Sequence, residues 1–205
     1  MRQLSELISD VRFASNETDE ERFPDERLLK FFNDAQDQIE ALIIISNFEN
    51  SPLDKFATLQ SGKKKYSLPS DIYAWNSVSN VRFVNGRKIP RGHINDFVDN
   101  FYYYIVGKEI YFSDTLDNPV ELLYKAKLPR LESTSDTPEL PAMCESFLTT
   151  FVERKIAAIN SSMDVQNAGV FTTEEKELIT EIFSTNSSDQ SNILELRETD
   201  YYANY

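Results

Sequence analysis

Cysteine and histidine are almost absent from this 205-residue sequence, which contains one of each, Cys144 and His93. A single cysteine excludes an intramolecular disulfide and a cysteine-based zinc cluster, and a single histidine excludes a multi-histidine metal site. Cys144 falls on an apolar helical stripe and is expected to be a small buried hydrophobic residue. His93 has no recognisable nucleophile to activate, so we expect an ordinary surface or half-buried residue. We therefore predict no catalytic residues, no metal and no cofactor.

Glycine is scarce, with five residues, and long apolar runs are missing. No glycine belongs to a GxGxxG or GxxxxGK[ST] loop, which excludes nucleotide binding through these motifs. The longest strongly aliphatic run, residues 41–45, is too short to cross a bilayer, and the first residues lack the apolar stretch of a signal peptide. We expect a soluble protein with no membrane contact.

Acidic residues outnumber basic ones by 34 to 21, which gives a formal charge of −13. Because like charges repel, this balance disfavours tight non-specific binding to a nucleic-acid backbone. The hydrophobic content of 40%, rich in Phe and Tyr, nevertheless predicts a folded chain rather than a disordered acidic tail. The composition favours a structural or binding role over catalysis.

Basic residues gather in one part of the chain. Residues 54–91 contain eight basic and two acidic residues, a local charge of +6, which leaves −19 for the remainder. This difference could dock the basic segment onto an acidic neighbour, including another copy of the chain. For Lys63, Lys64 and Lys65 alone, a solvated hairpin tip is the simpler interpretation.

Apolar residues spaced three or four apart predict four helices. They cover about residues 2–13, 24–46 and 141–160 and a last segment after Thr172. Pro24 suits a first helical turn, because its missing N–H would have no intrahelical partner there. Thr172 and Glu175 form a capping box. The stripes expected to be buried are Leu4, Leu7, Ile8 and Val11; Leu28, Phe32, Ala35, Ile39 and Leu42; Cys144, Phe147, Leu148, Phe151, Val152, Ile156 and Ile159; and Leu178, Ile179, Ile182 and Phe183.

Between about residues 53 and 128 the hydrophobic period becomes alternating, which predicts an antiparallel sheet. Asn85-Gly86 predicts a hairpin with a tight primed turn, in which both residues take positive φ, and Gly107-Lys108 predicts a second hairpin. The alternation changes phase near 77–80, which indicates a bulged strand or two strands. Residues 120–128 predict a further strand with its even-numbered residues toward the core.

These elements predict an α+β fold, in which a helical bundle built from both termini carries an inserted antiparallel β domain. We assign residues 1–50 and 140–185 to the bundle, 51–130 to the inserted domain and 186–205 to an extended C-terminal tail. Three tyrosines on this polar tail could anchor it to a partner or pack on its own domain. The candidates for partner docking are Lys63, Lys64, Lys65, Arg87, Lys88, Arg91, Tyr201, Tyr202 and Tyr205.

Several short motifs occur in the order found in a known family. The runs SDVR at 9–12 and FPDERLLKFFNDAQDQI at 23–39 resemble the opening helices of the head-to-tail adaptor proteins of tailed, in particular short-tailed, bacteriophages. The later motifs are YSLPSDIY at 66–73, YYYIVGKEI at 102–110, YKAKLP at 124–129 and DTPELP at 136–141. The resemblance covers about residues 5–160 and leaves the tyrosine-rich tail outside.

The resemblance implies a virion structural protein without catalytic residues, made in the host cytoplasm. Such adaptors form a ring, commonly of twelve copies, at the neck between capsid and tail, in contact with the portal protein and tail proteins. DNA would pass through the ring without specific binding, during genome retention and ejection. An acidic ring suits this role, because its lumen repels phosphate.

Two other functions stay open on the sequence alone. A tail or baseplate protein would be present in six or three copies rather than twelve. A carbohydrate-binding module, or an enzyme, would use aromatic residues of the sheet as a ligand surface. Those residues are Tyr73, Trp75, Tyr102, Tyr103 and Tyr104.

Overall fold

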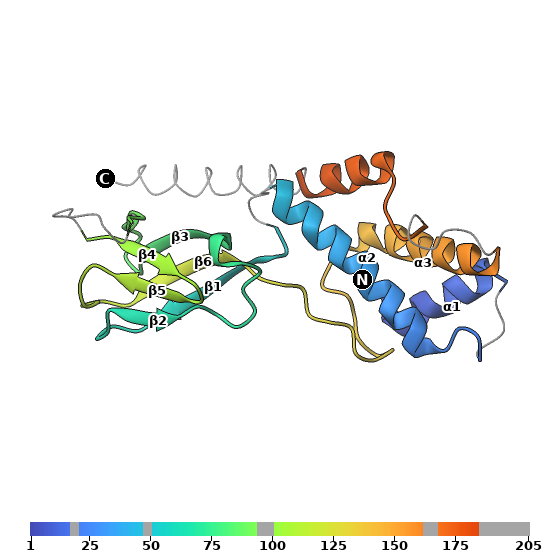
Figure 1. The fold of residues 1–205 in the computed structure, drawn as a ribbon, viewed down its shortest axis with the longest axis horizontal. Helices are drawn as coiled ribbons and strands as arrows, with labels where there is room; N and C mark the ends of the chain where they lie inside the picture. The colour runs from blue at the N-terminus through green and yellow to red at the C-terminus, as the bar shows by residue number, and fades with distance from the viewer. Residues whose placement is uncertain (17–20, 47–50, 94–100, 162–167, 185–205) are drawn as a thin grey trace, which may run out of the picture. The chain divides into compact units, whose positions relative to one another are not determined.

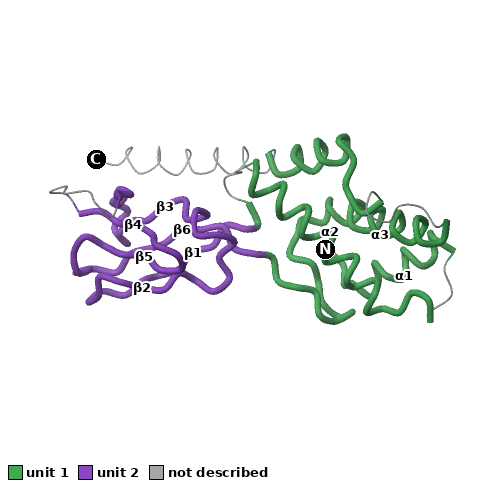
Figure 2. Tube along the Cα trace, viewed as in Figure 1, with its two compact units in different colours: residues 1–52, 128–205 green, residues 53–127 purple. Residues whose placement is uncertain are grey.

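The fold is α+β, with helices contributed by both ends of the chain and antiparallel strands between them (Figure 1). The computed structural model describes residues 1–16, 21–46, 51–93, 101–161 and 168–184. The chain divides into two compact units. Unit 1 comprises residues 1–52 and 128–205, and unit 2 comprises residues 53–127 (Figure 2).

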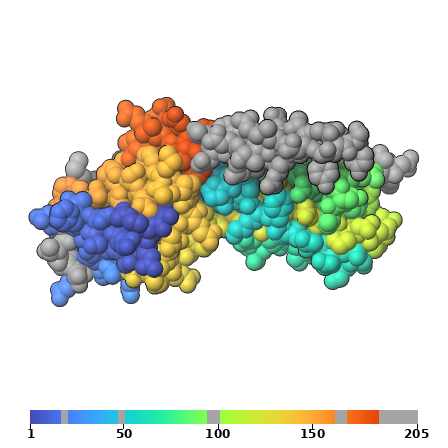
Figure 3. Space-filling view, turned by 180° about the vertical axis from the view of Figure 1, so that it is seen from behind, coloured from blue at the N-terminus to red at the C-terminus, as the bar shows by residue number. Residues whose placement is uncertain are grey.

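Unit 1 is a bundle of helices. They are α1 (Leu4–Ala14), α2 (Asp25–Ser46), α3 (Glu145–Asn160) and a further helix over residues 173–184. A 3₁₀ turn (Ala142–Cys144) leads into α3. Helix α3 contacts both α1 and α2, and Figure 3 shows the dark blue surface of α1 next to the orange surface of α3.

The apolar stripes form most of the core of unit 1, with corrections in three helices. Phe147 and Ile159 of α3 and Ile182 of the last helix were predicted to be buried but are only half-buried. The predicted residues of α1 are all buried. In α2 Ile43 is buried and Leu42 only half-buried, so the stripe ends one residue later than predicted. In the last helix Leu178 is 51% exposed, so its predicted burial is wrong. Ile179 and Phe183 are buried there, because residues four apart share one helical face, and Leu178 lies beside that face.

The helix-start signals at Pro24 and Thr172 are confirmed, whereas α3 begins at Glu145, after the 3₁₀ turn, rather than at 141. The Thr172 N–H donates to Glu175 Oε2 (2.8 Å) and the Glu175 N–H donates to Thr172 Oγ1 (3.2 Å), which is the capping box. Helix α2 begins immediately after Pro24, with Asp25 and Glu26 in its first turn. These two carboxylates lie where the helix dipole favours negative charge.

A connector, residues 128–131, carries the chain back from unit 2 into unit 1 along α2. Three buried polar side chains of α2, spaced like an apolar stripe, bind its backbone. Asn33 exchanges two hydrogen bonds with Leu131 (2.9 and 3.0 Å), Gln36 donates to the Pro129 carbonyl (2.8 Å), and Glu40 accepts from the Leu128 N–H (2.6 Å). We call these three residues the polar clamp. It satisfies backbone groups that would otherwise be buried without partners.

Unit 2 consists of two three-stranded antiparallel sheets, with strand orders β1-β6-β3 and β2-β5-β4. The strands are β1 (Asp54–Leu59), β2 (Lys65–Ser67), β3 (Val78–Phe83), β4 (Tyr103–Val106), β5 (Glu109–Phe112) and β6 (Val120–Lys125). One apolar core contains residues of both sheets, among them Val81 and Leu122 of the first and Ile110 of the second. The two sheets therefore pack face to face.

Three strand predictions are confirmed. Gly107-Lys108 connects β4 and β5 as a two-residue turn, with Val106 opposite Glu109 and Gly107 at φ 60°. The pairing of β3 with β6 shifts register between Val78 and Asn80, which is the predicted bulge. The even-numbered residues from 120 to 128 are all buried.

The turn at Asn85-Gly86 differs from its prediction. Gly86 alone takes positive φ, at 89°. The Phe83 carbonyl accepts from the Gly86 N–H (2.8 Å), and the Phe83 N–H donates to the Arg87 carbonyl (2.9 Å). This is a three-residue loop with a glycine bulge rather than a primed two-residue turn. Beyond it the returning chain makes a single bridge, from Lys88 to Arg82, instead of a strand.

Candidate docking surfaces of unit 2

The three consecutive lysines do not form the tip of a hairpin. The strands before and after them, β1 and β2, belong to different sheets, so this connection crosses from one sheet to the other. Lys65 already lies in β2. The carbonyls of Lys63 and Lys64 accept hydrogen bonds from backbone N–H groups of Leu116 (3.1 Å) and Phe112 (2.8 Å). The hairpin prediction was wrong because alternation does not say which strands pair.

Two of these lysines are paired with acidic neighbours. Lys64 Nζ lies 2.9 Å from Asp114, and Lys65 Nζ lies 2.8 Å from Glu109. The hydrogen bonds with the lysines lower the pKa of both carboxyl groups and raise the pKa of Lys65. Three of these groups are exposed and Glu109 is partly exposed, so water and salt weaken these pairs. Lys63 has no acidic partner within the described residues, so its charge is the most available of the three.

Tyrosines form a strip on β4 and β5 beside Lys65. The rings of Tyr104 and Tyr111 are stacked at 5.2 Å and 2°, and Tyr102 lies 6.3 Å from Tyr104. Lys65 Nζ lies 5.4 Å from the Tyr111 ring. Tyr103 instead faces the core at 4% exposure, and burial raises its pKa. It therefore cannot belong to the sugar-binding surface considered from the sequence.

Arg91 is placed against an exposed aromatic ring. Its guanidinium carbon lies 5.7 Å from the centre of the Trp75 ring, and Trp75 is 55% exposed. Such a cation–π contact favours one orientation of the arginine over the ring. A second pair of this kind in unit 2 is Arg82 over the Phe56 ring, at 5.6 Å, with Phe56 61% exposed.

Arg87 and Lys88 follow a turn whose residues line a hollow in the surface. The hollow has a volume of about 330 Å³. Both side chains are exposed, and neither has an acidic partner within the described part of the chain. The lining residues are Phe83, Val84, Asn85, Asn118 and Pro119. We call this feature the end hollow.

The end hollow is a surface feature that the sequence did not predict. It combines the β3 turn with the loop before β6, two segments that are distant in sequence. The Val84 N–H donates to the Pro119 carbonyl (3.4 Å), which joins them. The sequence shows that an apolar residue, Val84, stands in this turn, but it does not show that the residue is exposed. Val84 is 60% exposed.

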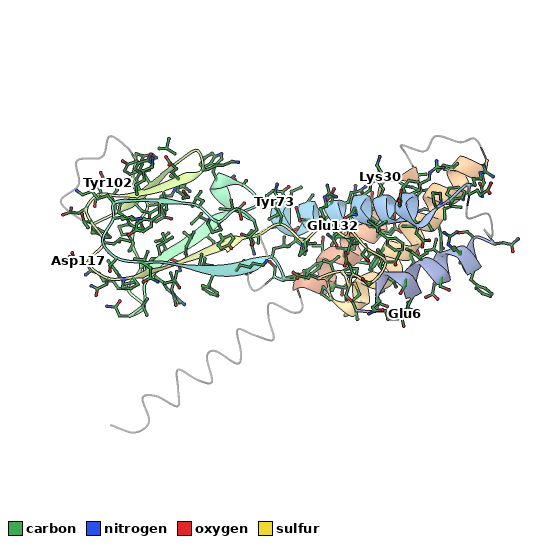
Figure 4. All side chains as sticks on the ribbon, turned by 90° about the horizontal axis from the view of Figure 1, so that it is seen from below. Glu6, Lys30, Tyr73, Tyr102, Asp117 and Glu132 are labelled. Atoms are coloured by element: carbon green, nitrogen blue, oxygen red, sulfur yellow. The ribbon has the colours of Figure 1, made fainter. Side chains whose placement is uncertain are left out.

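The predicted docking residues therefore do not form one cluster. Lys64 and Lys65 pair with acids at the strand crossing, Arg91 stacks on Trp75, and Arg87 and Lys88 follow the turn that lines the end hollow. In Figure 4, Tyr102 and Asp117 lie toward the same end of unit 2. The three tail tyrosines, Tyr201, Tyr202 and Tyr205, lie outside the described residues.

Groups that could carry catalysis are poorly placed for it. Cys144 is completely buried, and this burial raises the pKa of its thiol to about 12. It is the buried hydrophobic residue that its position predicted, and the thiolate required of a nucleophile does not form at neutral pH. His93 is exposed. Within the described ranges no three His, Cys, Asp or Glu residues are grouped to hold a metal, and no helix is long and apolar enough to cross a bilayer.

Comparison with models of known protein families gives an informative match. A family model described as "SU10 adaptor protein" matches residues 2–194 of this chain. The match includes both units and ends immediately before Glu195. A search of curated proteins found no match to the chain.

Proposed function

Because this chain belongs to the SU10 adaptor protein family, we propose that it forms the ring beneath the portal protein that joins the capsid to the tail. Membership confirms, at the level of the family, the resemblance to phage adaptors that the ordered motifs indicated. The family is one of structural adaptors, in agreement with a role as a phage structural protein rather than an enzyme. The ring would contain twelve copies.

The uneven distribution of charge between the units is the observation that supports a ring most directly. Unit 2 contains eleven basic and eight acidic residues, a net +3, whereas unit 1 contains ten basic and 26 acidic residues, a net −16. Opposite charges on different parts of one chain favour head-to-tail contacts between copies, which close into a ring when the rotation allows.

The acidic unit also suits a conduit for DNA. A wall of negative charge repels the phosphate backbone, so DNA can pass during retention and ejection without being held. In this proposal the helical unit contacts neighbouring copies and the portal protein, and unit 2 contacts tail proteins. The site of action is the neck of the virion.

The test is the copy number of this chain relative to the portal protein in purified virions, measured by quantitative mass spectrometry. A ratio near one to one is expected for the ring. A half or a quarter would overturn the ring and indicate a tail or baseplate protein present in six or three copies. Absence from virions would overturn the structural role and favour a binding module or an enzyme, for which a glycan array is the next measurement.

A further inference from the structure

Strand β1 forms an open edge of the first sheet of unit 2. It pairs with β6 alone, whereas the other edge strand, β3, is bridged to the chain that returns from its turn. The register places Leu53 opposite Ala126, and the Ala126 N–H donates to the Leu53 carbonyl (2.7 Å). Because alternate residues of an antiparallel strand bond to the same neighbour, Lys55, Ala57 and Leu59 also direct their backbone groups toward β6.

The residues between them direct their backbone groups away from β6. Phe56 and Thr58 thus have their N–H and C=O groups at the open edge, and no residue that the structure describes forms a hydrogen bond with these four groups. Such a row is a template for a further strand, which proteins often block with a proline or a bulge. Strand β1 has no proline, and its register with β6 is unbroken. The edge can therefore accept another strand.

An exposed aromatic side chain lies in the middle of this edge. Phe56 is 61% exposed, and the register places it opposite Leu123, on the face of the sheet that points away from the core. The Arg82 guanidinium carbon lies 5.6 Å from the centre of the Phe56 ring, and Arg82 also pairs with Glu121 (2.9 Å). An exposed phenylalanine beside unpaired backbone groups favours a partner that supplies both a strand and an apolar contact.

We propose that this partner is a second copy of the chain, whose β1 pairs antiparallel with β1 about a two-fold axis at Ala57. Phe56 then lies opposite the partner's Thr58, and Thr58 lies opposite the partner's Phe56. Among the two-fold registers of this strand, only this one pairs all four open groups with one another. The two three-stranded sheets become one continuous sheet across the axis.

The side chains of β1 suit this register. Ala57 lies on the axis, where the opposing backbones approach most closely and a small residue fits. The two Phe56 rings lie diagonally across the axis, within the reach of aromatic side chains, so each loses exposure to water. Lys55 stands opposite the partner's Leu59, so no like charges face each other. An axis at Lys55 would instead place two lysines opposite each other, which is unfavourable.

A contact of this kind uses the same surface on both copies, so it cannot continue from copy to copy around a ring. The dimer therefore belongs to the free chain, in which it covers an edge that would otherwise recruit other strands. It forms in a solution of this chain alone and does not rest on the proposed function. The copy number in virions is measured separately, so either proposal can fail without the other.

The test measures the mass of the full-length chain in solution by sedimentation. We expect the average mass to rise toward that of two chains as the concentration increases from about 1 μM to 1 mM. Thr58→Pro removes an edge N–H that β6 does not use, so it should weaken the dimer about tenfold or more and leave the fold intact. Thr58→Ala keeps this N–H and is the matched control.

The exposed ring is tested in the same way. Phe56→Ala should weaken the dimer about tenfold, because the rings lose their contact across the axis. The control is Val106→Ala, since Val106 is an exposed apolar residue of the other sheet (48% exposed) and its replacement should leave the dimer unchanged. Circular dichroism establishes that each variant is folded.

A disulfide crosslink measures the register. Ala57→Cys should form a disulfide between copies on oxidation, because residues opposite each other at this position have Cα atoms about 4.5 Å apart, within the range of a disulfide. Lys55→Cys and the wild-type chain, whose Cys144 is buried, should not crosslink. A mass of one chain at every concentration, a dimer that survives both Thr58→Pro and Phe56→Ala, or crosslinking of Lys55→Cys in place of Ala57→Cys would each overturn the proposal.

Discussion

At the scale of single residues, Cys144 shows how burial decides chemistry. The side chain lies at the end of the 3₁₀ turn before α3, completely buried. Desolvation penalises the thiolate, so the pKa of the thiol rises to about 12. In the unfolded chain the same thiol ionises near pH ~8.5. The unfolded state therefore loses this proton first as the pH rises, and the folded state loses stability above that value.

The variant Cys144→Ala tests this consequence. At neutral pH the substitution should cost about 1 kcal/mol through lost packing. Between about pH 9 and 11 the wild-type chain should lose more stability than the variant, because only the wild type has this thiol to ionise when unfolded. Urea unfolding at a series of pH values measures both effects. Parallel pH profiles for the two proteins would contradict a raised pKa of the Cys144 thiol in the folded state.

The lysines at 63–65 show which residue properties a sequence can reveal. Their charge and exposure were predicted, and the structure has all three exposed. Their partners were not predicted, because Asp114 and Glu109 lie 50 and 44 positions after Lys64 and Lys65 and reach them only through the pairing of β2 with β5. Pairing is a tertiary property that local alternation does not encode.

Charge reversal tests whether these lysines dock a partner. We expect Lys63→Glu, Lys64→Glu and Lys65→Glu together to reduce the yield of infectious particles, because an acidic partner would then be repelled. The control is Lys30→Glu, an exposed lysine on α2 of unit 1 that is labelled in Figure 4. An unchanged yield from the triple variant, with the protein folded, would contradict docking through this surface.

At the scale of elements, the polar clamp on α2 forms hydrogen bonds with the backbone of the connector, which an apolar stripe could not do. Asn33→Ala removes both hydrogen bonds to Leu131 and leaves buried backbone groups without partners. We expect a loss of about 1–3 kcal/mol in the free energy of unfolding. The matched control is Asp37→Ala on the same helix, whose exposed ion pair with Arg130 (3.0 Å) should contribute less than about 1 kcal/mol. Equal losses in chemical denaturation would contradict the clamp.

The capping box formed by Thr172 and Glu175 is a second local interaction, and it stabilises only the last helix. Thr172→Ala removes the side-chain acceptor of the Glu175 N–H and should destabilise the last helix by about 1 kcal/mol. Thr173→Ala, one residue later and exposed, is the control. Hydrogen exchange over residues 173–184 measures the effect, and we expect faster exchange in the first variant only. The same exchange rate in both variants would mean that Glu175 alone fixes the helix start.

Helices were predicted more completely than sheets, and the reason is physical. The signals for α1, α2 and the capping box are contained within a few neighbouring residues. The polar clamp was missed because Asn33, Gln36 and Glu40 have the composition of a solvated face, and only the position of the connector makes them buried. The end hollow was missed for the same reason, since it needs two distant loops.

At the scale of the whole molecule, each unit has its own apolar core. Ile110 is fully buried in unit 2 and Ile39 is fully buried in unit 1, so Ile110→Ala and Ile39→Ala form a matched pair. Each should cost about 2–5 kcal/mol. We expect each substitution to speed hydrogen exchange mainly in its own unit. Uniform acceleration across both units by either variant would contradict separate cores.

The two points where the chain passes between the units lie next to each other in unit 2. The Ala126 N–H donates to the Leu53 carbonyl (2.7 Å), and Lys125 Nζ lies 2.8 Å from Asp54. A segment whose first and last residues are bonded together closes on itself, so its length and content can vary without moving its ends apart. Evolution can therefore exchange this insert between relatives as a cassette, and an engineer can replace it with a short turn or graft it into a different host protein.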